Sequence, residues 1–287
     1  MAVSAAARDT AWDQTAEVRA ALTFITRSDT KPAFHSAAYT GGEPKVFFEV
    51  EQHSVAIHDL RPFAGALSLD REGFELLRHE TAVSDLYDDG QVETVYYREI
   101  EDLLRAVTGA SRVVVFDATR RSDGGAGARN RDGLRGPASR VHVDYTEKSG
   151  PQRVKDLLGE AEAARLAASG ARIVQINVWR PIRGPVERSP LALADASSVG
   201  PQDLIATDQV FPDRIGEIYL LAHNPQQRWY YAPHMTPDEV LLIKGYDSLT
   251  DGRARFTPHG AFDLPHTPAD APPRESIEVR TLVVIED

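Results

Sequence analysis

The feature that most constrains the fold is a series of short strand-like segments from Arg172 to the C-terminus. Each is rich in β-branched or aromatic residues, and turns rich in Pro and Gly separate them. The predicted strands are Arg172–Trp179, Gly216–His223, Gln227–Ala232, Glu239–Lys244, Arg253–Thr257 and Ser276–Glu286. Many short strands with such turns favour a sandwich or barrel. A jelly roll is the natural closure, because it brings strands that are distant in sequence to a common mouth.

The first half of the chain mixes helical and extended patterns. Helices are predicted at Ala16–Ile25, Asp70–His79, Val92–Val107 and Pro151–Ala168. Strands are predicted at Lys45–Val50, Ser54–Ile57 and Arg112–Phe116. We therefore expect a mainly β (α+β) single domain over 1–287. Within it, 1–110 is read as an N-terminal helical and hairpin elaboration, and 111–287 as a jelly-roll catalytic core with a helical insertion at 151–169.

Composition excludes several classes of protein. The net charge of −11 argues against nucleic acid or an anionic membrane as a partner. The absence of Cys excludes disulfides, thiolate nucleophiles and Cys-ligated metals, so any metal must be held by His and carboxylate groups. No apolar run approaches the length of a membrane span, and the N-terminus lacks an apolar signal core. We expect a soluble cytoplasmic protein, either a monomer or a homodimer.

The stretch RVHVDYT carries the clearest chemical signal. It places His142 and Asp144 two residues apart among β-branched residues, so on a strand both side chains project from the same face. An imidazole and a carboxylate held in this way are two of the three ligands in a 2-His-1-carboxylate site for non-heme Fe(II). The alternative is an ordinary surface pair on a strand, because His-x-Asp alone is a weak motif.

The remaining groups for such a site lie near the C-terminus. His259 in RFTPHGAF is the candidate second His, and it must come from a distant strand. Arg274 and Arg280 in PRESIEVR are candidates to bind an anionic cosubstrate, because a guanidinium fork suits a carboxylate. Positions 274, 276, 278 and 280 share one face of the predicted strand.

Competing motifs are weaker. The run GGAGARN follows a strand, but it lacks the third glycine of a dinucleotide-binding turn and does not lead into a helix. There is no GxSxG elbow for a serine hydrolase. The Arg residues of the loop Ser122–Ser139 are expected to be solvated, Trp229 to Tyr231 to belong to the core, and Lys244 with Asp247 to form a structural pair.

Longer stretches resemble one family. They are RVHVDYT, NVWRPI at 177–182, PLALADASSV at 190–199, HNPQQRWYYAPHMTPDEVLLIKGYDS at 223–248, PHGAF at 258–262 and PRESIEVR at 273–280. Residues 95–287 are similar to the iron(II)/2-oxoglutarate-dependent hydroxylases and desaturases of secondary metabolism. Fungal hydroxylase/desaturases, gibberellin desaturase-like proteins and a component of cephamycin methoxylation belong to that family.

The resemblance implies a double-stranded β-helix with Fe(II) on His142, Asp144 and His259. It implies 2-oxoglutarate and O2 as cosubstrates, with the distal carboxylate of 2-oxoglutarate on Arg274 and Ser276 or on Arg280. Asn177 is a further candidate donor to the cosubstrate, and a role in a turn or strand ladder is its alternative.

The implied reaction oxidises an unactivated C–H bond of a small-molecule metabolite, by hydroxylation or by desaturation or cyclisation, and releases succinate and CO2. The alternative from another class is a metal-free jelly-roll protein that binds a ligand or assists a biosynthetic pathway.

Overall fold

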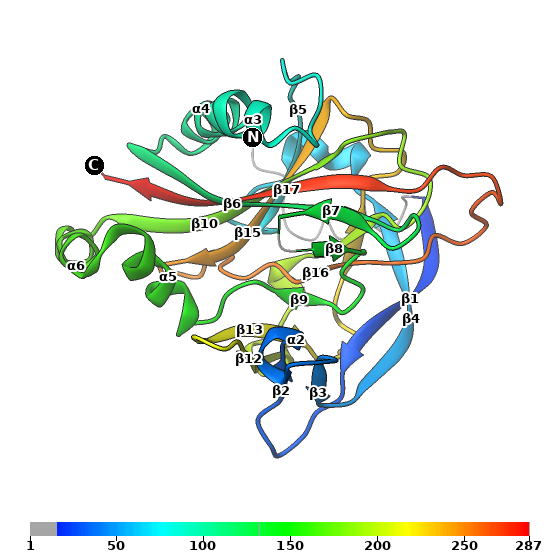
Figure 1. Cartoon of the computed structure of the whole chain (residues 1–287), viewed down its shortest axis with the longest axis horizontal. Coiled ribbons are helices and arrows are strands. Elements are labelled where there is room, and N and C mark those ends of the chain that lie inside the picture. The colour runs from blue at the N-terminus through cyan, green and yellow to red at the C-terminus, as the bar shows by residue number, and fades with distance from the viewer. Residues whose placement is uncertain (1–15, 132, 287) are drawn as a thin grey trace.

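Two β-sheets face each other and enclose the centre of the molecule, as the computed structural model in Figure 1 shows. The structure describes residues 16–131 and 133–286. The larger sheet has ten strands in the order β1-β4-β14-β11-β16-β9-β13-β12-β2-β3, and the smaller has five in the order β5-β15-β10-β17-β6. Apart from the consecutive pairs β12–β13 and β2–β3, neighbouring strands in both sheets are not consecutive in the chain, which is the arrangement of a jelly roll. The predicted mainly β fold is confirmed.

The strands of the ten-stranded sheet are β1 (Glu17–Ile25), β2 (Ala33–His35), β3 (Lys45–Phe47), β4 (Val50–Asp59), β9 (His142–Val143), β11 (Leu191–Ala194), β12 (Leu204–Val210), β13 (Ile215–Leu221), β14 (Trp229–Tyr231) and β16 (His259–Ala261). Those of the five-stranded sheet are β5 (Phe74–Arg78), β6 (Arg112–Ser122), β10 (Arg172–Pro181), β15 (Glu239–Asp247) and β17 (Glu275–Ile285). A separate hairpin consists of β7 (Ala128–Asn130) and β8 (Gly133–Arg135).

The two faces of β17 have opposite chemistry. Ile277 and Val279 belong to an apolar cluster with Ile100 and Leu104 of helix α4 (Tyr97–Thr108), which covers the outer face of the sheet. Because side chains alternate along a strand, Ser276 and the other even-numbered polar residues point the other way, towards the ten-stranded sheet. Strand β17 is therefore apolar where α4 packs and polar where it faces the larger sheet, whereas Trp179 and Ile243 of the neighbouring strands pack against the larger sheet in an apolar cluster.

Helices are few and lie outside the sheets. A turn of α3 (Asp89–Gln91) and a π-helical turn (Val92–Tyr96) lead into α4, which Gly109 ends in the left-handed conformation. The remaining helices are α2 (Ala37–Thr40), α5 (Ser149–Leu158), α6 (Glu160–Ser169) and the short 3-10 turns Arg61–Ala66, Ala196–Ser198 and Pro201–Asp203. Among the described residues, no helix is long and apolar enough to cross a membrane.

The helix predicted at Pro151–Ala168 is two helices, because Gly159 separates α5 from α6 with a φ of 85° and a ψ of 156°. Gly170 ends the second one in the left-handed conformation, as predicted. Ser149 lies inside the first turn of α5 rather than before it. The Thr146 hydroxyl accepts the Ser149 amide at 3.1 Å and takes the capping role.

Three other local predictions were wrong. Ala16–Ile25 forms β1, because Ala20, Leu22 and Phe24 alternate into a buried cluster when β1 pairs with β4. Within Asp70–His79 the chain turns at Gly73, which has a φ of 87°, and then forms β5 against β15. Arg253–Thr257 forms no strand among the described residues; its backbone is bonded to Asp70 and Lys244.

The beginning of the chain reaches the centre of the molecule. The carbonyl of Thr23 on β1 accepts the amide of Val141, one residue before His142. Strand β5 extends the five-stranded sheet beside β15. Both sheets are thus completed by strands from the first 80 residues, for which the sequence suggested no role.

Candidate active site

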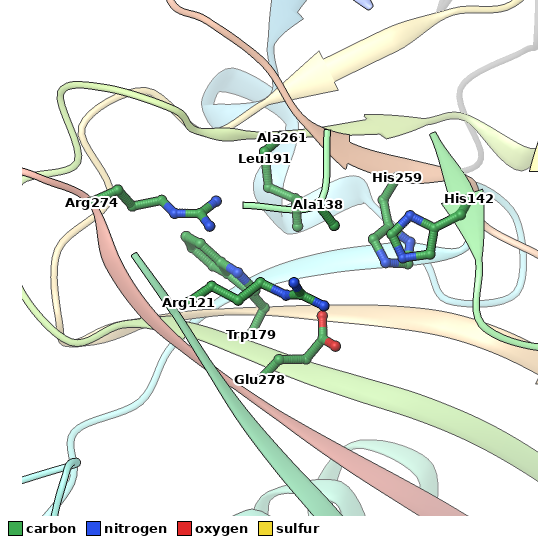
Figure 2. A pocket seen from close by; sticks show the side chains of 9 residues that line it. All are labelled: Arg121, Ala138, His142, Trp179, Leu191, His259, Ala261, Arg274 and Glu278. Carbon is green, nitrogen blue, oxygen red and sulfur yellow. The ribbon is translucent and has the colours of Figure 1, made fainter. Parts of the chain in front are cut away.

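Two histidines meet at the centre of the ten-stranded sheet. His142 on β9 and His259 on β16 are directly opposite each other in an antiparallel pair. Their ring centroids are 4.7 Å apart, and Figure 2 shows the two rings side by side at one end of a pocket. The strand pairing therefore brings together two residues that are far apart in sequence.

Both rings are held in the same tautomer. Nδ1 of His142 is 2.9 Å from the Arg140 carbonyl, and Nδ1 of His259 is 3.0 Å from the Thr257 carbonyl. A carbonyl oxygen only accepts, so each Nδ1 carries the proton and each Nε2 keeps its lone pair. Burial and the neighbouring His259 lower the pKa of His142 to about 4, which keeps this ring neutral at physiological pH. Neutral imidazoles with a free Nε2 are metal ligands.

Asp144 lies next to this pair as an ionised carboxylate. Burial alone would raise the pKa of Asp144, but the Arg280 guanidinium outweighs it and the pKa stays well below its ordinary value. Oδ2 accepts hydrogen bonds from Asn177 Nδ2 and from Arg280 Nε, each at 2.8 Å. Oδ1 is 3.6 Å from His142 Nε2. One carboxylate oxygen is thus occupied by protein donors, and the other faces the imidazoles.

The spacing of these groups is slightly wider than in a filled metal site. With bonds of about 2.1 Å, two adjacent ligand atoms of one metal are about 3 Å apart. In the described part of the chain, no three His, Asp or Glu side chains are already gathered at metal-ligand spacing. The 3.6 Å between Asp144 Oδ1 and His142 Nε2 is within a small side-chain rotation of it. The donor set of two neutral imidazoles and one carboxylate fits Fe(II).

Arg280 was expected to be a cosubstrate ligand, but its contacts are with carboxylates of the protein. Its Nε donates to Asp144, Nη1 to Asp117, and Nη2 is 2.8 Å from Glu278. Burial lowers the pKa of Arg280, but these three carboxylates more than compensate and raise it well above its ordinary value. Every nitrogen of this guanidinium therefore has a protein partner.

Asn177 was likewise expected to donate to the cosubstrate. It is fully buried on β10, and its Nδ2 donates to Asp144 while its Oδ1 accepts from Gln175. The Gln175 amide fixes which way round the Asn177 amide lies, so Asn177 and Arg280 together hold the Asp144 carboxylate in one orientation.

Arg274 has a very different environment. It is 2% exposed, and its Nη1 donates to the Ser189 carbonyl at 3.0 Å. Its Nε and Nη2 are buried without a hydrogen-bond partner. The guanidinium carbon lies 5.8 Å from the centre of the Trp179 ring. Burial and the nearby charge of Arg121 lower the pKa of Arg274 to about 10. A buried guanidinium with unpaired donors is costly unless an anion occupies the site.

The two histidines and Arg274 line the same pocket (Figure 2). Its other lining residues are Arg121, Ala138, Trp179, Leu191, Ala261 and Glu278. Ser276, 1% exposed, lies between Arg274 and Glu278 along the same face of the strand. The pocket thus has metal-ligating groups at one end and unpaired cationic donors at the other.

Sequence reasoning missed Arg121. The predicted strand ended at Phe116, whereas β6 continues to Ser122 and pairs with β17 along almost its whole length. The pairing of Arg121 with Ser276 places Arg121 on the inner face, and the run Asp117 to Ser122 has no strict apolar–polar alternation that could have indicated this.

The predicted Lys244–Asp247 pair is present, and it stabilises the segment before His259. Lys244 Nζ is fully buried and donates to Asp247 at 2.7 Å, to Asp70 at 2.8 Å and to the Ala254 carbonyl at 3.0 Å. The Lys244 carbonyl accepts the Thr257 amide. The aromatic run Trp229 to Tyr231 is buried, as predicted.

Comparison with known proteins agrees with this geometry. The profile of the family described as oxidoreductase/YMDC permease-like domain matches residues 22–284. The hydroxylase/desaturase efuI of Hormonema carpetanum is 37% identical over 254 residues, which cover 81% of this chain and 84% of that protein. The Fe(II)/2-oxoglutarate-dependent dioxygenase nvfI of Aspergillus novofumigatus is 34% identical, covering 84% of this chain and 87% of that protein.

A solved structure is also similar over nearly the whole chain. The iron and alpha-ketoglutarate-dependent endoperoxidase NvfI superposes with a TM-score of 0.82 at 30% identity, covering 96% of this chain and all of that one. The chain therefore belongs to the Fe(II)/2-oxoglutarate-dependent dioxygenases, an oxidoreductase family with a jelly-roll fold that includes hydroxylases, desaturases and an endoperoxidase. Its cofactors are Fe(II), 2-oxoglutarate and O2.

Proposed function

We propose that His142, Asp144 and His259 hold the Fe(II) of this oxygenase, and that Arg274 with Ser276 binds the distal carboxylate of 2-oxoglutarate. The observation that carries the proposal is one pocket with two imidazoles at one end, each bonded through Nδ1 to a carbonyl, and the unpaired donors of Arg274 at the other. In an extended 2-oxo dicarboxylate, the 2-oxo acid group suits a metal held by the imidazoles, and the distal carboxylate suits the guanidinium of Arg274.

The protein's own residues perform four tasks in this proposal. The Nε2 atoms of His142 and His259 and Oδ1 of Asp144 offer three ligands and leave the opposite face open. Arg280 and Asn177 act as positioning residues, because both bond the other oxygen of Asp144. Arg274 anchors the cosubstrate. Ala138, Leu191 and Ala261 form an apolar wall that limits the entry of water.

With Fe(II) and O2 present, decarboxylation of 2-oxoglutarate to succinate and CO2 supplies the oxidising power for attack on a C–H bond. We propose a small secondary metabolite as the substrate, oxidised by hydroxylation or by desaturation or cyclisation. This is in keeping with the relatives named hydroxylase/desaturase. A cytoplasmic location and a monomeric or homodimeric state remain predictions, as does the division of the chain into 1–110 and 111–287 with an insertion at 151–169.

The His142→Ala variant tests the proposal. It removes one ligand, so we expect loss of succinate release and loss of the visible absorption band that Fe(II) and 2-oxoglutarate give without oxygen. His266→Asn is the matched control, because His266 is exposed on a loop with a positive φ that Asn tolerates. If His142→Ala folds normally and still releases succinate, the assignment of the metal ligands is wrong. A wild-type chain that binds neither Fe(II) nor 2-oxoglutarate would indicate the metal-free alternative.

A further inference from the structure

The pocket is lined by a second arginine, Arg121, to which the proposed function gives no role. Arg121 lies on β6, and its residue partner across the antiparallel pair is Ser276 of β17. Directly opposite residues in such a pair project from the same face. Arg121, Ser276 and the flanking Arg274 and Glu278 therefore face the same space, and three of these four residues line the pocket.

The Arg121 guanidinium forms few polar contacts with the protein. Its Nη1 donates to the Gly136 carbonyl at 3.0 Å, and among the described residues it forms no ion pair within 4.0 Å. Burial lowers the pKa of Arg121, while the charge of Glu278 opposes that effect. Figure 2 shows the guanidinium groups of Arg121 and Arg274 entering the pocket from neighbouring segments.

Glu278 does not account for Arg121. Its Oε1 is already 2.8 Å from Nη2 of Arg280. The pocket thus holds two guanidinium groups, and its single lining carboxylate already has an ion-pair partner. The two positive charges disfavour each other, and an anion bound between them would offset this repulsion.

We propose that Arg121 is a second ligand for the distal carboxylate of 2-oxoglutarate, which lies between Arg121, Ser276 and Arg274. The inference depends on the proposed function, since it extends the same cosubstrate site. Arg274 supplies two unpaired donors, Arg121 supplies donors from the neighbouring strand, and Ser276 is the residue paired with Arg121 across the two strands. Such a cradle selects a 2-oxo acid that carries a second carboxylate.

A cycle of two variants and two ligands tests this role. Anaerobic calorimetry with Fe(II) compares 2-oxoglutarate with 2-oxopentanoate, which has the same chain length but a methyl group in place of the distal carboxylate. We expect Arg121→Met to weaken 2-oxoglutarate binding by about tenfold or more, the effect of losing a charge-assisted hydrogen bond. Its affinity for 2-oxopentanoate should stay within about twofold of wild type.

Arg120→Met is the matched control. Arg120 is the preceding residue of β6 on the opposite face, where it bonds the Leu86 carbonyl and Asp89. It should leave the preference for 2-oxoglutarate over 2-oxopentanoate unchanged, with thermal melting used to confirm that each variant folds. If Arg121→Met does not fold, Arg121→Lys replaces it, and an intermediate loss is then expected because Lys lacks the planar fork.

Several results would overturn the inference. Unchanged 2-oxoglutarate binding would mean that Arg121 faces another ligand, such as an anionic substrate. Equal weakening of both ligands, or recovery in Arg121→Met with Glu278→Gln, would mean that Arg121 only neutralises Glu278. If Arg274→Met loses selectivity while Arg121→Met keeps it, this inference fails and the proposed function stands. If wild type binds no 2-oxoglutarate, the proposed function fails.

Discussion

Arg274 and Arg280 are six residues apart on the same face of the C-terminal strand, yet their surroundings are opposite. Arg280 contacts three carboxylates, those of Asp117, Asp144 and Glu278. The guanidinium of Arg274 has no carboxylate partner among the described residues, and two of its nitrogens lack any hydrogen bond. The same kind of side chain thus has a complete set of protein partners in Arg280, and unpaired donors in Arg274, which lines the pocket.

The difference teaches how to separate a ligand-binding arginine from a positioning one. A buried guanidinium whose donors are all paired stabilises the fold, and losing it exposes unpaired charges. A buried guanidinium with unpaired donors costs stability until a ligand arrives. The two residues should therefore respond in opposite ways to the same substitution.

The largest expected effect is from Arg280→Met. Removing the cation leaves Asp144, Asp117 and Glu278 without their shared partner, so we expect a loss of about 3–5 kcal/mol in the free energy of unfolding. Because Asp144 loses a positioning bond, Fe(II) affinity should also fall by about 10–100-fold. Denaturant unfolding and anaerobic Fe(II) titration measure the two effects. Normal stability and normal Fe(II) binding with weak 2-oxoglutarate binding would instead make Arg280 the cosubstrate ligand.

Lowering the pH should destabilise the metal-free protein through His142, one of the proposed metal ligands. The pKa of His142 is about 4 in the folded chain and about 6.5 when unfolded, so between these values only the unfolded chain binds the proton. The free energy of unfolding should therefore fall as pH drops from 6.5 to 4, by about 3 kcal/mol from this residue.

Unfolding curves for wild type and His142→Asn across this pH window measure the contribution, which the variant should lack. Arg274→Met should keep the wild-type slope, because the pKa of Arg274 is about 10 and lies outside the window. Parallel curves for wild type and His142→Asn would contradict a neutral buried His142.

Arg274→Met should have the smallest effect on the fold and a selective effect on binding. We expect 2-oxoglutarate affinity to fall by about 10–100-fold. Fe(II) affinity without cosubstrate should not change, and the free energy of unfolding should stay level or rise because two unpaired buried donors disappear. Calorimetry and denaturant unfolding are the measurements. A strongly destabilised Arg274→Met would show that this arginine, too, is structural.

Much of the site was visible in local sequence. The His-x-Asp pair, the later His259 and Arg274 were each singled out from residue type and spacing, whereas the pairing of Arg274 with Ser276 was implied by the family resemblance. The structure brings both histidines and Arg274 to one pocket. Of the strands predicted in the second half all but Arg253–Thr257 are present, but β11, β12 and β16, the strand that carries His259, were not predicted. These features succeed because alternation along a strand fixes which side chains share a face, whatever the strand pairs with.

The errors have the opposite cause. Ala16–Ile25 fits a helical pattern as well as an alternating one, and only pairing with β4 selects the strand. Arg121 was missed because the end of β6 is set by its long pairing with β17. In each case the deciding contact came from a residue far away in the sequence.

By itself the sequence determined which groups could form the site: two histidines, one aspartate, two candidate arginines, and no cysteine to compete for the metal. Only the tertiary structure decided the roles of the arginines. Asp117 and Asp144, which precede Arg280 by more than a hundred residues, reach its guanidinium, whereas no carboxylate of the described chain pairs with the guanidinium of Arg274. The role of a charged side chain depends on the charged groups around it, and when those groups are far away in sequence only the fold brings them together.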